Sequence, residues 1–329
     1  MMSEMIVDIR DLYVNFNIYE GVTRVLNGVN FRVAKGQKVG LIGEAGCGKT
    51  TTVKSIMKIL QMPPAEIVGG EIYLEGLDVL KMSQRDLQMM RRKTVSMIFQ
   101  DPTSALNPVF KVGDQIGDII KYNQLAFGNK VSKEEIHEKT VQVLKEVQMP
   151  DPERIMNSYP IQLSGGMRQR ICIAMALVSA TNLLIADEPG TNLDVTIQDQ
   201  VLKLLGELVK DRGTSIILIS HALGAVKGLV DRVYVMYAGS MVEAAKTKDL
   251  FSDPLHPYTK ALFNAVPKLT GGGIPMGIPG RIPNYLSPPT GCRFNPRCPH
   301  AKPECLENSP PFYQMGDEHE VACYLYGGR

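Results

Sequence analysis

The sequence lacks the features that mark two broad classes of protein. Lysine and arginine total 36 and aspartate and glutamate total 34, so the net charge is only +2. A protein that neutralises nucleic-acid phosphates usually has a strongly basic surface, and this balance argues against one. The longest apolar run, Ile171 to Ala180, has ten residues, whereas a membrane-spanning helix needs about 20. The N-terminal segment carries acidic residues and no apolar signal core, so we expect a cytosolic chain without a membrane span.

Closely spaced cysteine pairs are also missing. Four of the six cysteines fall near the C-terminus, at Cys292, Cys298, Cys305 and Cys323. Zinc sites usually contain pairs separated by two to four residues, and these spacings are longer. In a cytosolic chain, clustered thiols are more often metal ligands than disulfides. Four thiolates without histidine suit either zinc or a [4Fe–4S] cluster, and composition leaves both open.

The composition changes near residue 255. Residues 271–329 contain ten of the 21 prolines and nine of the 30 glycines, a proportion that normally predicts disorder. Such a segment can form only a small apolar core, so we expect a cross-link such as a metal site to stabilise its fold. We therefore divide the chain into a domain at 1–255 and a C-terminal extension at 256–329.

Strand-like and helix-like patterns alternate through the larger domain. Apolar runs that suit strands buried on both faces of a parallel sheet occur at Met5–Ile9, Val39–Ile42, Val95–Phe99, Leu183–Ala186 and Ile216–Ser220. Patterns more typical of antiparallel strands occur at Val14–Phe16, Gly28–Val33 and Gly70–Leu74. Amphipathic helices are predicted at Val131–Val147 and Val195–Arg212.

A phosphate-binding loop is predicted after the run Val39–Ile42. The segment matches G-x-x-x-x-G-K-[ST] with Gly43, Glu44, Ala45, Gly46, Cys47, Gly48, Lys49 and Thr50, and Thr51 continues into a predicted helix. Glycines let backbone N–H groups surround phosphate, and the helix N-terminus adds positive partial charge. Lys49 would reach the β- and γ-phosphates of a nucleoside triphosphate, and the Thr50 hydroxyl would bind Mg²⁺.

A second strand supplies the acidic residues that such a site needs. Asp187 and Glu188 follow the apolar run Leu183–Ala186. Asp187 would hold Mg²⁺, and Glu188 would polarise the attacking water. A further helix start follows two glycines, at Leu163, Ser164, Gly165, Gly166, Met167 and Gln169. Two phosphate-binding helix starts in one chain indicate a composite site that a second subunit completes.

At these residues the sequence resembles the ATP-binding cassette family, whose signature is LSGGQ, with Met167 in place of its glutamine. The resemblance implies a glutamine at Gln100 that senses Mg²⁺, a D-loop aspartate at Asp194, and a switch histidine at His221 that contacts the γ-phosphate. It also implies an aromatic residue that stacks on adenine. Phe16 and Tyr19 both qualify, with a slight preference for Tyr19.

This family implies an α/β fold of known arrangement. We expect a P-loop NTPase (RecA-like) core, an antiparallel β subdomain, a helical signature subdomain at about 105–175, and a small irregular Cys-rich C-terminal domain. The segments Phe251–Pro267 and Cys292–Cys298 resemble the dipeptide/oligopeptide importer branch. That resemblance favours a [4Fe–4S] cluster on Cys292, Cys298, Cys305 and Cys323 over zinc.

The resemblance implies an ATP-hydrolysing subunit that energises the import of peptides or a related small solute. Its partners would be a second ATPase subunit (a related chain or another copy), two transmembrane permease subunits and an extracytoplasmic solute-binding protein, with no nucleic acid. It would lie at the cytoplasmic face of the membrane, with ATP and Mg²⁺ in its site. The alternatives are a soluble cassette ATPase acting on nucleic acid or ribosomes, and an exporter subunit. The single cassette argues against the first and the C-terminal segment against the second.

Two cysteines lie outside the C-terminal group. Cys47 stands in the phosphate-binding loop beside Lys49, where a helix N-terminus and a cation could lower the pKa of its thiol and make it reactive. A simple substitution of one small residue for another is the favoured alternative. Cys172 lies within an apolar helix and is predicted to be a small buried hydrophobic residue.

Overall fold

The computed structural model describes residues 4–179, 181–191, 193–265 and 277–328. The chain forms two compact units. Unit 1 consists of Met1–Ile6, Ala34–Lys38 and Lys81–Leu229. Unit 2 consists of Val7–Val33, Val39–Leu80 and Val230–Arg329.

Unit 1 contains three parallel strands, in the order β8–β7–β6. Their bounds are β6 (Val95–Ile98), β7 (Leu183–Asp187) and β8 (Ser215–Ile219). Every residue of β7 and β8 is buried, as expected of strands covered on both faces. The predictions of strands at 95–99, 183–186 and 216–220 are confirmed.

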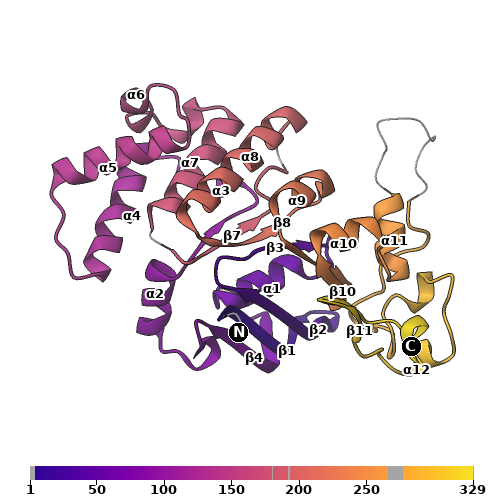
Figure 1. The fold of residues 1–329 in the computed structure, drawn as a ribbon. Coiled ribbons are helices and arrows are strands. Elements are labelled where there is room, and N and C mark those ends of the chain that lie inside the picture. Colours follow the sequence, from indigo (N-terminus) through magenta and orange to yellow (C-terminus); the bar gives the residue numbers. More distant parts are fainter. Residues whose placement is uncertain (1–3, 180, 192, 266–276, 329) are drawn as a thin grey trace. The chain divides into compact units, whose positions relative to one another are not determined.

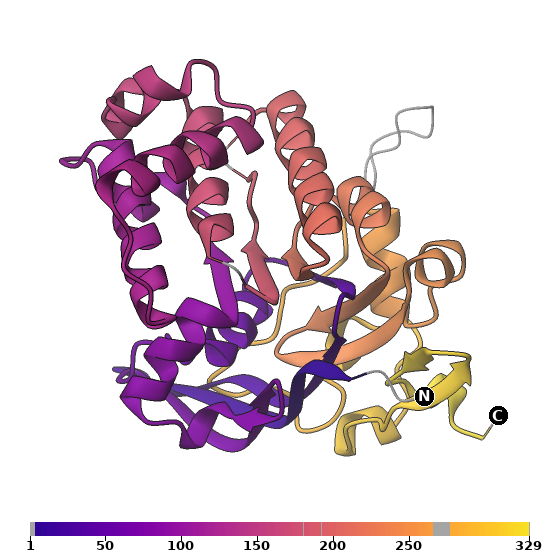
Figure 2. The same cartoon turned by 60° about the vertical axis from the view of Figure 1, so that its left-hand side comes forward.

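Helices make up most of the remainder of unit 1. Their bounds are α2 (Gln84–Lys93), α3 (Pro102–Ala105), α4 (Val112–Ala126), α5 (Lys133–Glu146), α6 (Pro152–Met156), α7 (Gly165–Val178), α8 (Val195–Arg212) and α9 (Leu223–Leu229), with a 3₁₀ turn, η2, at Pro160–Gln162. Helices α4, α5, α6 and α7 pack on one another and form one group in Figure 2. This group occupies the segment in which we expect the helical subdomain. The predicted helices at 131–147 and 195–212 are confirmed as α5 and α8.

Local signals explain where these helices begin. The Ser132 hydroxyl accepts a hydrogen bond from the backbone N–H of Glu135, whose carboxylate accepts one from the N–H of Ser132. This capping box satisfies two N–H groups that α5 itself leaves unpaired. At the far end of α8, Arg212 pairs with the Glu146 carboxylate and donates to the Leu177 carbonyl, which ties α8 to α5 and α7.

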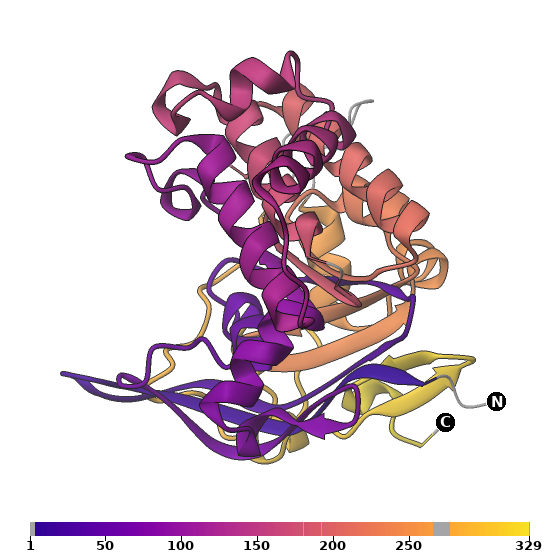
Figure 3. The same ribbon diagram turned by 90° about the vertical axis from the view of Figure 1, so that its left-hand side faces the viewer.

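An antiparallel sheet runs through unit 2 in the order β2–β1–β4–β5 (Figure 3). Its strands are β1 (Met5–Ile18), β2 (Gly21–Ala34), β4 (Ala65–Leu74) and β5 (Leu77–Asp78). The three antiparallel predictions are confirmed. The prediction that Met5–Ile9 belongs to a parallel sheet is wrong, because Val7–Ile9 pairs antiparallel with Ile72–Leu74. Ile6–Ile9 is buried throughout, so its apolar run indicates burial on both faces and says nothing about strand direction.

The second set of strands in unit 2 has the order β3–β9–β10–β12–β11. The strands are β3 (Lys38–Ile42), β9 (Arg232–Tyr237), β10 (Ser240–Lys246), β11 (Tyr313–Gly316) and β12 (His319–Val321). Strands β3 and β9 are parallel, which confirms the predicted strand Val39–Ile42. Strand β10 pairs antiparallel with β9 and with β12, and β12 pairs antiparallel with β11. The C-terminal extension, which contains β11 and β12, therefore continues the sheet beyond β10 (Figure 1). The sequence pattern had not predicted β9 or β10.

Short helices complete unit 2. They are α1 (Lys49–Ile56), α10 (Thr247–Ser252), α11 (Pro257–Asn264) and α12 (Glu304–Glu307), with 3₁₀ turns η1 (Val79–Lys81), η3 (Asn295–Arg297) and η4 (Tyr324–Tyr326). A buried carboxylate joins the extension to β10. Glu243 is bonded to His319 Nε2 at 2.8 Å and accepts the backbone N–H groups of Leu255 and His256. Burial alone would raise the pKa of Glu243, but these bonds outweigh it and lower the pKa.

Stability should depend on pH through a neighbouring histidine. His256 is completely buried at the N-cap of α11, and this burial lowers its pKa to about 4. The unfolded chain takes up the proton near pH 6.5 and the folded chain only near pH 4, so unfolding becomes easier as pH falls through that window. The loss amounts to about 3 kcal/mol across the window.

The variant His256→Asn should flatten this dependence, because Asn also accepts at a helix N-cap but does not titrate. Urea unfolding between pH 7 and pH 4 measures the effect. Glu243 also makes the protein less stable as pH falls, but only below the pKa of about 4.3 that a glutamate has in the unfolded chain. Because Glu243 is present in both the wild type and the variant, it does not affect their comparison. Equal slopes for the two proteins between pH 6.5 and 5 would show that His256 is not responsible.

Candidate functional site

The loop of residues 43–48 joins β3 to α1 in unit 2 and needs glycine at two positions. Gly43 has φ +152°, and a Cβ there would lie 2.1 Å from the Met236 carbonyl oxygen. Gly48 has φ +109°, and its Cβ would lie 2.7 Å from a methyl group of Leu26. Any side chain at these positions would collide with the surrounding chain, so the tight curl depends on both glycines.

The side chain of Lys49 is buried and turns back towards this loop. Its Nζ donates to the carbonyl oxygens of Gly43 at 2.8 Å and Glu44 at 3.0 Å. Ala45 and Gly46 are exposed, and Thr50 and Thr51 are half-buried in the first turn of α1. The predicted phosphate-binding residues therefore form one continuous loop and helix start.

The structure corrects one prediction for Cys47. Its side chain is fully buried, and burial raises the pKa of the thiol, although Lys49 acts in the opposite direction. The less favoured interpretation, a lowered pKa and a reactive thiol, is therefore wrong, because desolvation of the thiolate outweighs the nearby charge. The prediction for Cys172 is confirmed: it is buried in α7, and its pKa is raised to about 12.

Glu188 is the centre of a polar cluster in unit 1. Its carboxylate lies 2.5 Å from His221 Nε2 and accepts hydrogen bonds from Gln100 Nε2 at 2.9 Å and Thr191 Oγ1 at 3.2 Å. Its backbone has φ +50°, outside the usual range for a non-glycine residue. Its N–H donates to the Ile219 carbonyl of β8, which fixes this turn at the end of β7.

The sequence motifs identify Gln100, Glu188 and His221 separately, and the structure brings their side chains together. The motifs do not give Thr191 a role, although it donates to Glu188. Its position only three residues after Glu188 is the sequence feature that could have indicated this contact. Asp187 is buried at the C-terminal end of β7, directly before this cluster.

The predicted signature residues form the start of α7 in unit 1. Ser164 is the N-cap, and its hydroxyl accepts the backbone N–H of Met167 at 3.3 Å. Ser164 is exposed, while Leu163 and Gln169 are buried. A Cβ on Gly166 would lie 2.8 Å from Ile197 of α8, so glycine allows the two helices to approach closely.

The remaining predicted residues have simple surroundings. Asp194 caps α8, where its carboxylate accepts the backbone N–H of Ile197 at 3.0 Å. Phe16 is half-buried in β1, and Tyr19 is fully exposed in the turn between β1 and β2. Neither observation selects the aromatic residue that would stack on adenine.

The four C-terminal cysteines line one small cavity in unit 2, together with His256 and His300. The backbone N–H of Lys302 donates to Cys305 Sγ at 3.5 Å. Burial raises the pKa of the Cys292, Cys298 and Cys323 thiols, and neighbouring backbone N–H groups act in the opposite direction. Across the described ranges, no three side chains of Cys, His, Asp or Glu are grouped so that they could hold a single metal ion.

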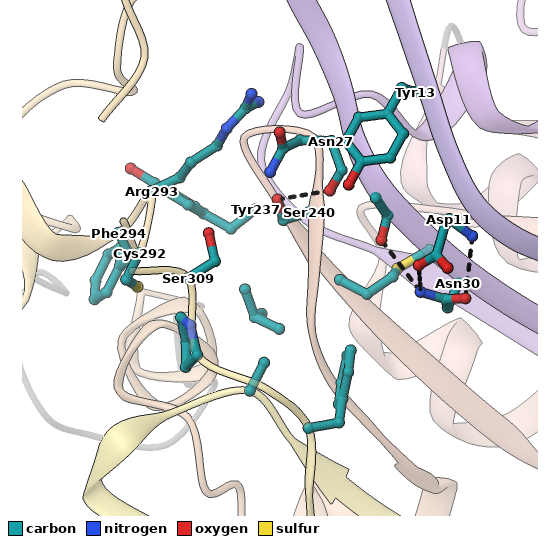
Figure 4. Close-up of a pocket in the computed structure, with 16 residues that line it drawn as sticks. Asp11, Tyr13, Asn27, Asn30, Tyr237, Ser240, Cys292, Arg293, Phe294 and Ser309 are labelled. Atoms are coloured by element: carbon teal, nitrogen blue, oxygen red, sulfur yellow. Dashed lines mark hydrogen bonds between the residues drawn. The ribbon is translucent and has the colours of Figure 1, made fainter. Parts of the chain in front are cut away.

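A larger cavity of about 260 Å³ also lies in unit 2 (Figure 4). Cys292, Arg293 and Phe294 line one side of it, and Asn27 and Asn30 of the antiparallel sheet line another. Its lining includes none of the residues that the sequence assigned to nucleotide binding or hydrolysis. In the part of the chain that the structure describes, no helix is long and apolar enough to cross a membrane.

Comparisons with known proteins agree with this geometry. Residues 26–191 match the family model described as "ABC transporter", and residues 242–305 match "Oligopeptide/dipeptide transporter, C-terminal region". The chain is 44% identical to a probable peptide ABC transporter ATP-binding protein of Sinorhizobium fredii, with 98% of this chain and 95% of the relative aligned. It is 42% identical to the oligopeptide transport ATP-binding protein OppD of Bacillus subtilis, with 97% and 88% aligned.

A solved structure supports the fold alone. A dimeric ATP-binding cassette bound to ADP and phosphate in a post-hydrolysis state matches with a TM-score of 0.65 and 23% identity, covering 73% of this chain and 98% of that one. The ABC model spans the phosphate-binding loop, the signature residues and Glu188, and the second model covers three of the four C-terminal cysteines. The chain therefore belongs to the ATP-hydrolysing subunits of the ABC transporter family, in its oligopeptide and dipeptide branch.

Proposed function

We propose that this chain hydrolyses ATP to drive the import of dipeptides or oligopeptides through a binding-protein-dependent transporter. The observation that carries the proposal is the Glu188 carboxylate, which is held by His221, Gln100 and Thr191 directly after the buried end of β7. Relatives of nearly full length that are named as peptide transport ATP-binding proteins support the choice of solute.

In this proposal each motif has one role. Lys49 exchanges its two carbonyl acceptors for β- and γ-phosphate oxygens, and the N–H groups at the start of α1 bind the same phosphates. Glu188 accepts a proton from the attacking water, while His221 contacts the γ-phosphate. Asp194 would communicate between paired subunits, and Phe16 or Tyr19 would stack on adenine.

The residues proposed for Mg²⁺ offer oxygen donors, which suit this hard cation. They are the Thr50 hydroxyl, the Asp187 carboxylate and the side-chain oxygen of Gln100. The nitrogen of the same Gln100 amide donates to Glu188, which leaves the oxygen as its metal-binding atom. When bound, Mg²⁺ neutralises charge on the phosphates of ATP.

A second ATPase subunit would complete the site. We propose that Ser164, Gly165, Gly166 and Met167 bind the ATP held by the partner's phosphate-binding loop. The exposed hydroxyl and the first N–H groups of α7 suit that role. The other partners would be two permease subunits and an extracytoplasmic solute-binding protein, which place this chain at the cytoplasmic face of the membrane.

We also propose a [4Fe–4S] cluster on Cys292, Cys298, Cys305 and Cys323. The shared cavity and its four thiols support it, and the Lys302 N–H that donates to Cys305 Sγ is a contact of the kind found around iron–sulfur clusters. A single zinc ion is less suitable, because in the described residues no three side chains of Cys, His, Asp or Glu are grouped so that they could hold one ion. When bound, the cluster supplies covalent links between distant parts of the extension.

Copurification followed by an ATPase assay tests the proposed transport function. The tagged full chain should copurify from native membranes with two permease subunits, and ATP hydrolysis by the complex should rise when binding protein and peptides are added. Stimulation by RNA or ribosomes instead, with no permease in the complex, would favour the soluble-ATPase alternative.

A pair of variants tests the composite site. Lys49→Ala should abolish ATP binding to the isolated monomeric chain, because Lys49 acts on nucleotide bound by its own loop. Ser164→Arg should leave that binding unchanged and should instead prevent ATP-dependent pairing. Calorimetric titration of verified monomers measures both. Equal losses of ATP binding in the two variants would contradict the composite site.

A further inference from the structure

An arginine of the Cys-rich extension contacts the phosphate-binding loop. Arg297 ends η3 and precedes Cys298, and its side chain is only 3% exposed. Its guanidinium forms a two-pronged ion pair with Glu44, with Nη1 2.8 Å from Oε2 and Nη2 3.2 Å from Oε1. The two residues are 253 positions apart in the sequence, and both belong to unit 2.

Three further contacts hold the guanidinium, two of them from within the extension. Nε donates to the Pro279 carbonyl at 2.8 Å, Nη2 donates to the Ile278 carbonyl at 3.0 Å, and Nη1 donates to the Tyr237 hydroxyl at 3.3 Å. With the two bonds to Glu44, these account for the five N–H donors of arginine. A lysine, with a single nitrogen, cannot reproduce this planar set of contacts.

Glu44 in turn controls the shape of the loop. Its backbone N–H donates to the Tyr258 hydroxyl at 2.8 Å, and its carbonyl accepts from Lys49 Nζ at 3.0 Å. The carboxylate is the third attachment, through Arg297. The backbone of Glu44 is therefore fixed between the extension and the lysine that is proposed to bind phosphate.

Two further contacts reach the same loop. The Tyr285 hydroxyl donates to the carbonyl of Gly46 at 2.8 Å. Arg293 donates to the Ala238 carbonyl, and the N–H of the next residue, Gly239, donates to the Cys47 carbonyl at 2.7 Å. Arg293 directly follows Cys292, and Arg297 directly precedes Cys298. Two of the proposed cluster ligands therefore each adjoin an arginine that contacts the phosphate-binding loop or the residue next to Gly239.

We propose that Arg297 is a positioning residue for ATP binding, which acts through Glu44 in two ways. It fixes the backbone of the phosphate-binding loop, and it neutralises a carboxylate that would otherwise repel a triphosphate. The proposal rests on the proposed nucleotide site and adds the extension as one of its structural supports. Because coupling is reciprocal, bound ATP should also protect residues 277–328 against proteolysis.

The first experiment measures ATP affinity in the full chain by calorimetry. Arg297→Met should raise the Kd for ATP about tenfold, which corresponds to 1.4 kcal/mol. Arg281→Met is the matched control, since Arg281 is an exposed arginine of the same segment, and its Kd should stay within about twofold of the wild type. Arg297→Lys, which keeps the charge but loses the paired contacts, should fall between the two.

The second experiment tests whether the effect passes through Glu44. Removing the unpaired carboxylate should relieve the repulsion, so Glu44→Gln/Arg297→Met should bind ATP more tightly than Arg297→Met alone. A merely structural role for Arg297 would not give this rescue. If Arg297→Met does not fold, Glu44→Gln alone supplies the test: ATP should protect the extension less than in the wild type.

The outcomes separate this inference from the proposed function. If Lys49→Ala binds ATP as the wild type does, the nucleotide site itself is wrongly assigned. If Lys49→Ala loses binding while Arg297→Met behaves like Arg281→Met, only the role of Arg297 fails. An absence of rescue in the double variant, or equal protection of the extension in Glu44→Gln, also overturns it.

Discussion

Glu188→Gln should slow ATP turnover by about 10²-fold or more while ATP binding persists, as expected when a general base is removed. The substitution keeps the shape of the side chain but replaces one carboxylate oxygen by an NH₂ group. It removes the negative charge of a carboxylate that lies 2.5 Å from His221 Nε2 and accepts hydrogen bonds from Gln100 and Thr191. Lys49 and its loop are unaltered, so the variant should accumulate with ATP–Mg²⁺ as a closed pair of subunits.

Steady-state ATPase activity of the assembled transporter measures the loss, and size-exclusion chromatography with ATP–Mg²⁺ measures the pairing. Glu207→Gln is the matched control, because Glu207 is an exposed acid on α8 and its change should leave both readouts unaltered. If the second ATPase subunit is a related chain, it should carry the corresponding substitution, so that its own site does not hide the loss. Near-normal turnover in that complex would exclude Glu188 as the base.

The parts of the fold that the sequence predicted are those governed by local pattern. The strands at 95–98, 183–187 and 215–219 are short apolar runs buried on both faces, and α5 and α8 have clear amphipathic periods and polar caps. The same reasoning was wrong for Met5–Ile9, since burial on both faces occurs in either kind of sheet. It also did not predict β9 and β10.

The candidate site shows the same division. The motifs identified Gln100, Glu188 and His221 one at a time, and the fold joins them through contacts between residues 33 to 88 positions apart. The less favoured interpretation of Cys47 as a reactive thiol is wrong, because spacing shows the nearby Lys49 but does not show that the thiol is buried. The Arg297–Glu44 pair was not foreseen, because no local period relates residues 253 positions apart.

The C-terminal extension supplies the second large expected effect, because a cofactor on its four cysteines would join parts of the chain that are distant in sequence. Ordering each residue costs about 1–2 kcal/mol of backbone entropy, and this Pro/Gly-rich segment has little apolar core to offset that cost. Its contacts with the rest of unit 2 include the short pairing of β12 with β10, the bond of Glu243 to His319, and the ion pair of Arg297 with Glu44. Four thiolates on one cofactor would add links within the part of the extension between Cys292 and Cys323.

Anaerobically purified protein should therefore be brown and contain about four irons per chain. Cys298→Ser should bleach the colour and make residues after 277 sensitive to limited proteolysis. Cys172→Ala is the matched control, because Cys172 is buried in α7 of unit 1 and its loss should leave the colour intact. The helices and strands of unit 1 should stay resistant in both variants. Stoichiometric zinc without iron or labile sulfide, in protein prepared without oxygen, would rule out the cluster. Oxygen must be excluded because it strips iron from a native cluster, so protein exposed to oxygen does not test the proposal.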